Sequence, residues 1–160
     1  MTITIRPATA HDVGTIMGFV RELAEFEREP EGVTSTEAIL HEALFGAHPA
    51  AEAIIAEHDG ERVGMAVFYH NFSTWTGKRG IWLDDLYVTP AARGSGAGRA
   101  LLSHLAGIAL DRGCARFEWW VLDWNARAID FYQKVGAEPM DEWTTQRVTG
   151  DALRKLAGRG

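Results

Sequence analysis

A glycine-rich turn constrains this chain more than any other feature of its sequence. The segment Arg93-Gly94-Ser95-Gly96-Ala97-Gly98-Arg99 follows a β-rich stretch that ends at Pro90, and it opens a helical pattern. Glycine lacks a Cβ atom, so three alternating glycines let backbone N–H groups and the positive end of the helix approach an anion closely. A phosphate group is the anion that such a turn best accommodates.

Two common nucleotide-binding motifs do not fit this turn. A dinucleotide fingerprint requires the spacing G-x-G-x-x-G in the first βα unit, whereas this turn has G-x-G-x-G late in the chain. The lysine of a Walker loop is also missing. A glycine loop that is merely flexible is the remaining alternative. Arg93 and Arg99 argue against it, because they place two cations at one turn of an acidic chain.

Length and composition favour one globular domain over residues 1–160. Apolar residues make up 46% and charged residues 24%, as in ordinary soluble domains. Sixteen Lys and Arg against twenty-two Asp and Glu give a net charge of −6, which argues against nucleic acid or an anionic membrane as a partner and favours a small cation. Cys114 is the single cysteine and no cluster has zinc spacing, so we expect a cytoplasmic protein without a metal.

The periodicity of apolar residues predicts an α/β fold. Strands are expected at residues 2–6, 53–57, 62–72, 80–89, 115–122 and 143–148, and helices at 11–29, 34–45, 97–112 and 126–135. For the second helix, Thr34 and Glu37 predict a capping box, and Gly46 predicts a left-handed end. Asp59-Gly60 predicts a hairpin turn. This order implies a mixed central sheet in which hairpin strands are antiparallel and crossover strands are parallel.

The turn and its surroundings resemble the GNAT acetyltransferases, whose acetyl-CoA loop follows the pattern Arg/Gln-x-x-Gly-x-Gly/Ala. Segment 93–98 fits this pattern at every fixed position, after the strand 82–88 where the family keeps it. The resemblance extends to the Ile5-Arg6-Pro7 opening and to segment 124–132. It implies a GNAT-type fold with helices on both faces of the sheet, and acetyl-CoA as the co-substrate.

Within this superfamily the chain is most similar to the diamine (spermidine/spermine) acetyltransferases. Trp75-Thr76-Gly77-Lys78, the paired acids after Leu83, and Asp141-Glu142-Trp143 carry that similarity. It implies a small cationic amine as acceptor and a homodimer. It also implies acceptor contacts at Phe26, Glu27, Asp84, Asp85, Glu118, Trp119, Trp120 and Asp141.

Acyl transfer to an amine requires a neutral nucleophile. An alkyl amine with a pKa near ~10.4 resists deprotonation at pH 7 by roughly 4.6 kcal/mol, so a proton acceptor is needed. Regular strand alternation would put Asp84 and Asp85 on opposite faces, so that only one of them could enter a given cleft. Solvated acids at a strand end are the alternative interpretation for either residue.

The leaving thiolate requires a proton donor. Tyr132 is the candidate, and the resemblance implies that it is the general acid; packing of an amphipathic helix is the alternative role. The resemblance further implies that CoA is contacted by the backbone of Leu86, Tyr87 and Val88, by the glycine-rich turn, and by Asn125, Ala126, Arg127 and Ala128. An acetyltransferase for an amino acid, lysine analogue, drug or protein amine is the nearest alternative function. A non-catalytic acyl-CoA-binding module is another, although it would have no need of Tyr132.

Overall fold

The computed structural model describes residues 2–160, which form two compact units. The first unit extends to Asp123 and the second covers Trp124–Gly160. None of the helices in residues 2–160 combines the length and the apolar character needed to cross a bilayer.

A five-stranded mixed sheet organises the first unit. Its order is β1-β2-β3-β4-β5, with antiparallel pairing from β1 to β4 and parallel pairing between β4 and β5. The strands are β1 (Thr4–Pro7), β2 (Glu52–His58), β3 (Glu61–Ser73), β4 (Lys78–Val88) and β5 (Phe117–Glu118). The mixed sheet confirms the expected α/β class, although β5 is much shorter than the expected strand at 115–122.

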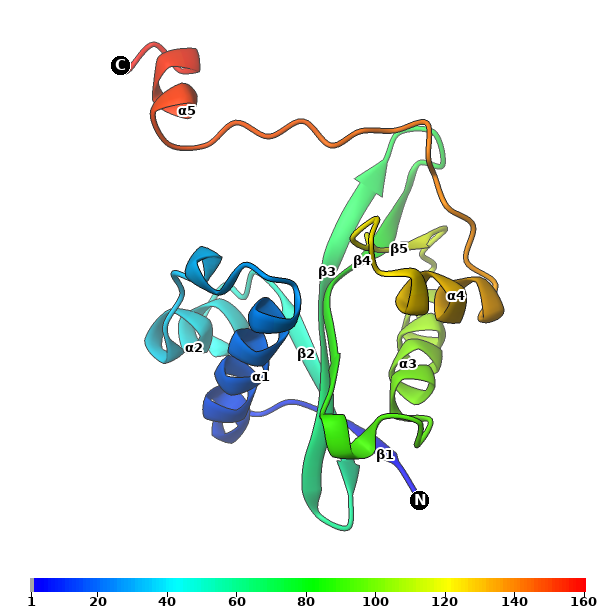
Figure 1. The fold of residues 1–160 in the computed structure, drawn as a ribbon. Coiled ribbons are helices and arrows are strands. Elements are labelled where there is room, and N and C mark those ends of the chain that lie inside the picture. Colours follow the sequence, from blue (N-terminus) through cyan, green and yellow to red (C-terminus); the bar gives the residue numbers. More distant parts are fainter. Residues whose placement is uncertain (1) are drawn as a thin grey trace. The chain divides into compact units, whose positions relative to one another are not determined.

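Helices cover both faces of this sheet. α1 (Val13–Phe26) and α2 (Glu37–Phe45) lie on one side, and α3 (Ala97–Asp111) lies on the other (Figure 1). Short 3₁₀ helices precede α1 at Ala10–Asp12, follow it at Pro30–Gly32, and follow β4 at Pro90–Ala92. The face of the sheet that carries α1 is called the α1 face below.

Helix α2 ends at Phe45 as expected, but its start and the conformation of Gly46 differ from the sequence expectation. Thr36, and not Thr34, is the N-cap, and its Oγ1 accepts a hydrogen bond from the Ile39 N–H at 3.2 Å. Gly46 ends the helix in an extended conformation with φ −74°, so the left-handed end was wrong. A Cβ atom at Gly46 would lie 2.4 Å from the Glu42 carbonyl oxygen, so close packing explains this glycine better than positive φ.

The β2–β3 hairpin confirms the expected turn. Asp59 and Gly60 both have positive φ, 50° and 78°, which matches the twist that a two-residue turn needs between antiparallel strands.

A buried acid fastens the start of α1 to the sheet. Asp12 is fully buried and forms ion pairs with Arg6 on β1 and Arg62 on β3, each at 2.8 Å. The hydrogen bond from Arg6 lowers the pKa of Asp12 to about 2, because it stabilises the carboxylate. This network fixes α1 relative to β1 and β3.

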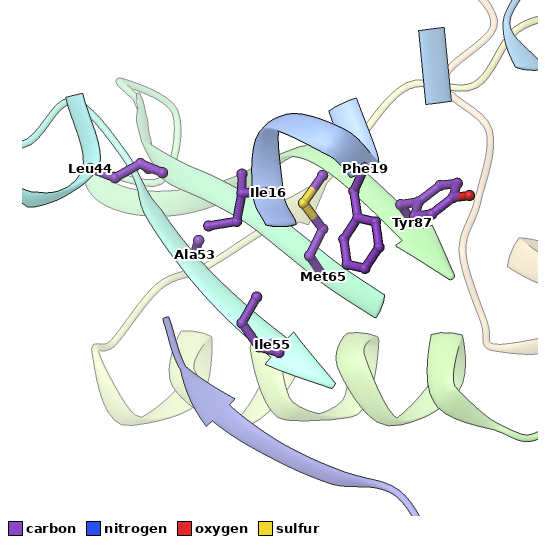
Figure 2. Packing of buried hydrophobic residues seen from close by; sticks show 7 residues of the cluster. All are labelled: Ile16, Phe19, Leu44, Ala53, Ile55, Met65 and Tyr87. Carbon is purple, nitrogen blue, oxygen red and sulfur yellow. The ribbon is translucent and has the colours of Figure 1, made fainter. Parts of the chain in front are cut away.

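Apolar packing holds α1 and α2 against the α1 face. The buried cluster consists of Ile16, Phe19, Leu44, Ala53, Ile55, Met65 and Tyr87 (Figure 2). The ring centroids of Phe19 and Tyr87 are 5.1 Å apart, which joins α1 to the end of β4. Helix α1 is therefore held rigidly against β4.

The second unit consists of α4 (Ala126–Lys134), an irregular segment, and α5 (Gly150–Leu156). Gly136 follows α4 with φ 98°, as a C-terminal glycine often does. The expected strand at 143–148 was wrong, because this segment has no regular secondary structure. The tail after it forms α5.

Candidate active site

A bulge in β4 sets the geometry of the candidate acceptor site. Asp85 is paired with Val67 and Leu83 with Phe68, so Asp84 is an extra residue without a partner in the β3 register. Val67 and Phe68 are neighbours and point to opposite faces, so Leu83 and Asp85 also point to opposite faces. Val67 packs against the α1-side cluster, which places Asp85 on the α1 face.

Asp84 lies on the same face as Asp85. Burial raises the pKa of Asp85, of Glu27 at the end of α1, and of Tyr69 on β3, and the nearby charge of Asp84 raises each of them further. Tyr69 shares a face with Met65 and Val67 by strand alternation, so all of these groups lie on the α1 face. The expectation that Asp84 and Asp85 occupy opposite faces was wrong, because it assumed a strand without a bulge.

Glu27, Asp84 and Asp85 therefore form an acidic trio. Burial raises the pKa of Asp85 to about 7, and the nearby charges of Asp84 and Glu27 add to this effect. Loss of hydration also raises the pKa of Asp84 and of Glu27. Like charges and poor hydration both penalise the ionised form, so Asp85 is poised to take up a proton near neutral pH, and the trio favours a bound cation.

The residues at 118–120 are divided between the two faces. Glu118 is paired with Trp82 in the parallel β4–β5 register, and the Trp120 ring lies edge-on to Trp82 with centroids 5.6 Å apart. Trp119 instead packs its ring against Phe117, with centroids 4.9 Å apart. Trp82 lies directly opposite Tyr69 on β3 and hence on the α1 face. Glu118 and Trp120 therefore share the face of the acidic trio, whereas Trp119 turns away from it.

The glycine-rich turn has the open geometry expected of an anion-binding turn. Gly94 and Gly96 have φ values of 81° and 90°, a conformation that side chains rarely adopt, and nothing lies within 4 Å of a Cβ placed on either. Ser95 Oγ accepts the N–H of Ala97 at 3.3 Å. The next two N–H groups, of residues 98 and 99, precede the first intrahelical bond and have no acceptor within the helix.

Arg93 is directed toward α1. Its guanidinium lies 5.6 Å from the centre of the Phe26 ring, and its Nε donates a hydrogen bond to the Val88 carbonyl at 3.3 Å. Phe26 was expected to contact the acceptor amine and Arg93 to contact CoA, yet their side chains are neighbours. Arg99, in contrast, is exposed in the first turn of α3.

The end of β4 has a strand neighbour on one side. Leu86, Tyr87 and Val88 pair with β3, whereas the pairing with β5 is limited to Ile81 and Trp82. Among the described residues, the β5 side of β4 therefore has no strand partner from Leu83 onward. Backbone N–H and C=O groups on that side can therefore form hydrogen bonds with a ligand.

Glu22 is a neighbour of this strand that the sequence analysis missed. The Tyr87 hydroxyl donates a hydrogen bond to Glu22 Oε2 at 2.5 Å. Burial, together with this bond, raises the pKa of Tyr87 to about 12, so the phenol stays protonated as a donor. The helical position of Glu22, one residue before Leu23, offered no signal for this pairing.

The second unit holds the remaining candidates. Asn125 caps α4, because its Oδ1 accepts the Ala128 N–H at 3.2 Å. Ala126 and Arg127, in the first turn, are exposed. Tyr132 lies on the same helix, half-buried, with its ring 5.6 Å from that of Phe131. Asp141 is exposed in the irregular segment after α4. Among residues 2–160, no group of three His, Cys, Asp or Glu side chains is arranged to hold a metal ion.

A protein-family comparison identifies the chain. The model described as "Acetyltransferase (GNAT) family" matches residues 14–137, which include both the acidic trio and the glycine-rich turn. The chain belongs to the GNAT acetyltransferase family. This match confirms the resemblance to GNAT acetyltransferases that residues 93–98 indicated.

Curated relatives of this GNAT acetyltransferase match it from end to end. Thialysine N-epsilon-acetyltransferase from Sus scrofa is 40% identical, with 99% of each chain covered. L-ornithine N5-acetyltransferase NATA1 from Arabidopsis thaliana is 28% identical, covering 95% of this chain and 86% of the relative. A spermidine/spermine N(1)-acetyltransferase-like protein 1 from Homo sapiens is 34% identical over 96% of this chain, but over 23% of its own length. The chain is an acetyl-CoA-dependent N-acetyltransferase.

Solved structures agree on the fold. An integron cassette protein from the mobile metagenome of V. cholerae superposes with a TM-score of 0.81 at 28% identity, and 98% of each chain is covered. A ribosomal-protein-alanine N-acetyltransferase from Brucella melitensis has a TM-score of 0.72 at 23% identity, covering 93% of this chain and 100% of the other. The mixed sheet with helices on both faces is therefore the GNAT fold.

Proposed function

We propose that this acetyltransferase acts on the terminal amine of a small molecule that carries a second cationic group, such as a diamine or polyamine. The observation that supports this acceptor class is the acidic trio, because Glu27, Asp84 and Asp85 bring three carboxyl groups together on one face of the sheet. A cationic substrate would relieve their mutual repulsion.

Asp85 is the proposed proton acceptor for the incoming ammonium group. A base whose pKa lies near 7 both exists in its ionised form at neutral pH and binds a proton well. The deprotonated amine attacks the thioester carbonyl, a C–N bond forms, and the C–S bond breaks. The first proton of the ammonium group goes to Asp85, directly or through one water molecule. The second proton, which the nitrogen releases as the amide forms, replaces the one that the departing thiolate takes up.

Tyr132 is the proposed proton donor to the departing thiolate of CoA. A phenol near pKa ~10 can protonate a thiolate near ~8.5 when the two are held close together. Only the hydroxyl is required for this step.

The glycine-rich turn is the proposed site for the pyrophosphate of acetyl-CoA. The unpaired N–H groups at the start of α3, the positive φ of Gly94 and Gly96, and the open space above both glycines support this assignment. The strand edge from Leu86 to Val88 is the proposed partner of the pantetheine arm, and Asn125 with the first turn of α4 the proposed partner of its distal part. We further propose that both compact units form a single acetyltransferase domain.

A lysine analogue is the second candidate acceptor, because three thialysine N-epsilon-acetyltransferases are 39–40% identical to this chain over nearly its whole length. Such a molecule also carries a second amine, so the trio suits it as well. A panel of a diamine, spermidine, thialysine, L-ornithine and a neutral-tailed monoamine, assayed by release of CoA thiol, separates the candidates. Thiol release with none of these amines would contradict the proposal.

The homodimer, which the family resemblance supports, and the cytoplasmic location, which the single cysteine supports, are further proposals. Light scattering of the purified chain with and without acetyl-CoA tests the dimer. The net charge of −6 supports the absence of a nucleic-acid partner.

A further inference from the structure

Two aromatic side chains that the sequence analysis did not single out lie beside the acidic trio. Tyr69 on β3 and Trp82 on β4 are directly opposite each other in the antiparallel register. Residues that face each other in this way have their Cβ atoms ~4.5–5.5 Å apart on one face. The two residues therefore form a cross-strand pair.

This pair lies on the α1 face, beyond the region that the buried cluster covers. Tyr69 follows Met65 and Val67 along one face of β3, but it is 38% exposed whereas Met65 is fully buried. Trp82 is half-buried, and the ring of Trp120 stands against it at an interplanar angle of 86°. An aromatic surface thus continues the line of the acidic residues on the same face.

The charge of Asp84 reaches this surface. Asp84 follows Trp82, the cross-strand partner of Tyr69, by two positions on β4. Burial raises the pKa of Tyr69, and the charge of Asp84 adds to this effect. An aromatic face with a neighbouring carboxylate is the arrangement that holds alkylammonium groups, because the ring quadrupole and the anion both attract the cation.

We propose that Tyr69 and Trp82 set acceptor specificity by holding the second cationic group of the amine, while the acidic trio holds the reacting one. The proposal rests on the proposed function, because it assumes a dicationic acceptor at the trio. Trp82 precedes Asp85 by three positions on β4, which corresponds to ~10 Å of extended strand, and less where the bulge shortens it. The two ends of a five-carbon diamine can therefore contact both groups at once.

Tyr69→Leu is the variant that tests this role, with 1,5-diaminopentane and 5-amino-1-pentanol as matched acceptors. Both acceptors have the same reacting amine, and only the first has a second cation. We expect Tyr69→Leu to raise the KM for the diamine about 5–10-fold and to change the KM for the amino alcohol less than about twofold, as loss of a cation–π contact predicts. Tyr69→Phe keeps the ring and should keep the diamine preference.

Phe72→Leu is the matched control. Phe72 lies on the same strand three residues later, is 65% exposed, and by alternation points to the opposite face. It should change the KM of neither acceptor. A similar rise for both acceptors in Tyr69→Leu, or the same diamine effect in Phe72→Leu, would overturn the proposal.

Calorimetric titration of 1,5-diaminopentane into the CoA complex of the wild type and of Tyr69→Leu separates this proposal from the proposed function. Binding that weakens in the variant supports the aromatic subsite, even if the diamine is not acetylated. Equal binding in both proteins contradicts it, whatever the activity. If the wild type acetylates none of the amines tested, that result would contradict the proposed function alone.

Discussion

Asp84 and Asp85 are consecutive residues of β4, yet both side chains lie on the α1 face of the sheet. The bulge at Asp84 produces this arrangement, because Asp85 pairs with Val67 while Leu83 pairs with Phe68. In a regular strand the two carboxyl groups would be separated by the sheet. Burial raises the pKa of Asp85 to about 7, and the repulsion that the shared face creates adds to this effect.

Asp85→Asn should abolish most of the activity while leaving acetyl-CoA binding intact. General acid–base groups contribute about 10²–10⁴ in rate, so we expect a loss of kcat in that range. In the wild type, kcat/KM should rise with pH as Asp85 ionises near 7, and this step should be absent in Asp85→Asn. A variant that keeps the step would show that another group accepts the proton.

The same substitution should stabilise the fold at high pH. The pKa of Asp85 is raised in the native state, so between pH 4 and 7 the folded chain holds a proton that the unfolded chain has released. The free energy of unfolding of the wild type therefore falls as pH rises through this window. At pH 8, Asp85→Asn should unfold with a free energy on the order of 1–3 kcal/mol higher than the wild type, and the gain should vanish near pH 4.

Asp12→Asn is the control with the opposite sign. The hydrogen bond from Arg6 lowers the pKa of Asp12 to about 2, so the Asp12 carboxylate stabilises the fold. Removing this carboxylate should therefore destabilise the protein at pH 8. Urea unfolding at pH 4 and pH 8 measures both variants. If the free energy of unfolding has the same pH dependence in Asp85→Asn and in the wild type, the pKa of Asp85 is not raised in the folded protein.

The sequence was sufficient to predict the mixed sheet, the β2–β3 hairpin and the glycine-rich turn, because these depend on local patterns. A β-rich run marks β3, and the pair Asp59-Gly60 favours a tight turn with positive φ. Glycines between a strand and a helix likewise permit the positive φ values found at Gly94 and Gly96. Each of these signals lies within a few neighbouring residues.

The composition of the acidic trio could be predicted, but its geometry could not. Nothing in Leu83-Asp84-Asp85-Leu86 signals a bulge, since the extra residue is defined by the register against Val67 and Phe68. The partnership of Tyr69 with Trp82 depends on the same register. The absent strand at 143–148 shows the converse limit, because β-type residues form a strand only where a partner strand is available.

Gly96→Val should weaken acetyl-CoA binding strongly. Gly96 has φ 90°, and a β-branched side chain there would both strain the backbone and fill the open space above the turn. We expect the Kd for CoA, measured by calorimetry, to rise by at least tenfold, which corresponds to about 1.4 kcal/mol.

Gly107→Val is the control for this glycine substitution. Gly107 lies in the interior of α3, where nothing is within 4 Å of an added Cβ and φ is not positive. Its substitution should leave the Kd for CoA unchanged. A folded Gly96→Val protein with normal CoA affinity would remove the turn from the binding site.

Glu27→Gln should reduce the preference for dicationic acceptors. Glu27 and Asp84 lie close enough for their charges to interact, so together they create a local negative field on the α1 face. A second ammonium group held at the adjoining Tyr69–Trp82 pair also gains from this field, on the order of 1 kcal/mol at low salt. The ratio of kcat/KM for a diamine to that for a monoamine of equal length should fall several-fold in Glu27→Gln, and less so at high ionic strength.

Glu25→Gln removes the same charge from an exposed position of α1. It controls for the change in overall charge, since both variants alter the net charge of −6 by one unit. An equal effect of both substitutions would indicate a general field and not a specific contact of Glu27.

Tyr132→Phe should separate catalysis from binding and from folding. The substitution removes one hydroxyl from a half-buried ring on α4 and keeps the ring that lies 5.6 Å from Phe131, so the packing of the helix should be preserved. If the hydroxyl protonates the thiolate of CoA, kcat should fall about 10²–10⁴-fold while the melting temperature and the Kd for acetyl-CoA stay unchanged. Because a thioester with a more acidic thiol needs this proton less, an activated acyl thioester should restore part of the lost rate in Tyr132→Phe but not in Asp85→Asn. A kcat within a few-fold of the wild type with acetyl-CoA itself would mean that water protonates the thiolate and that Tyr132 serves packing alone.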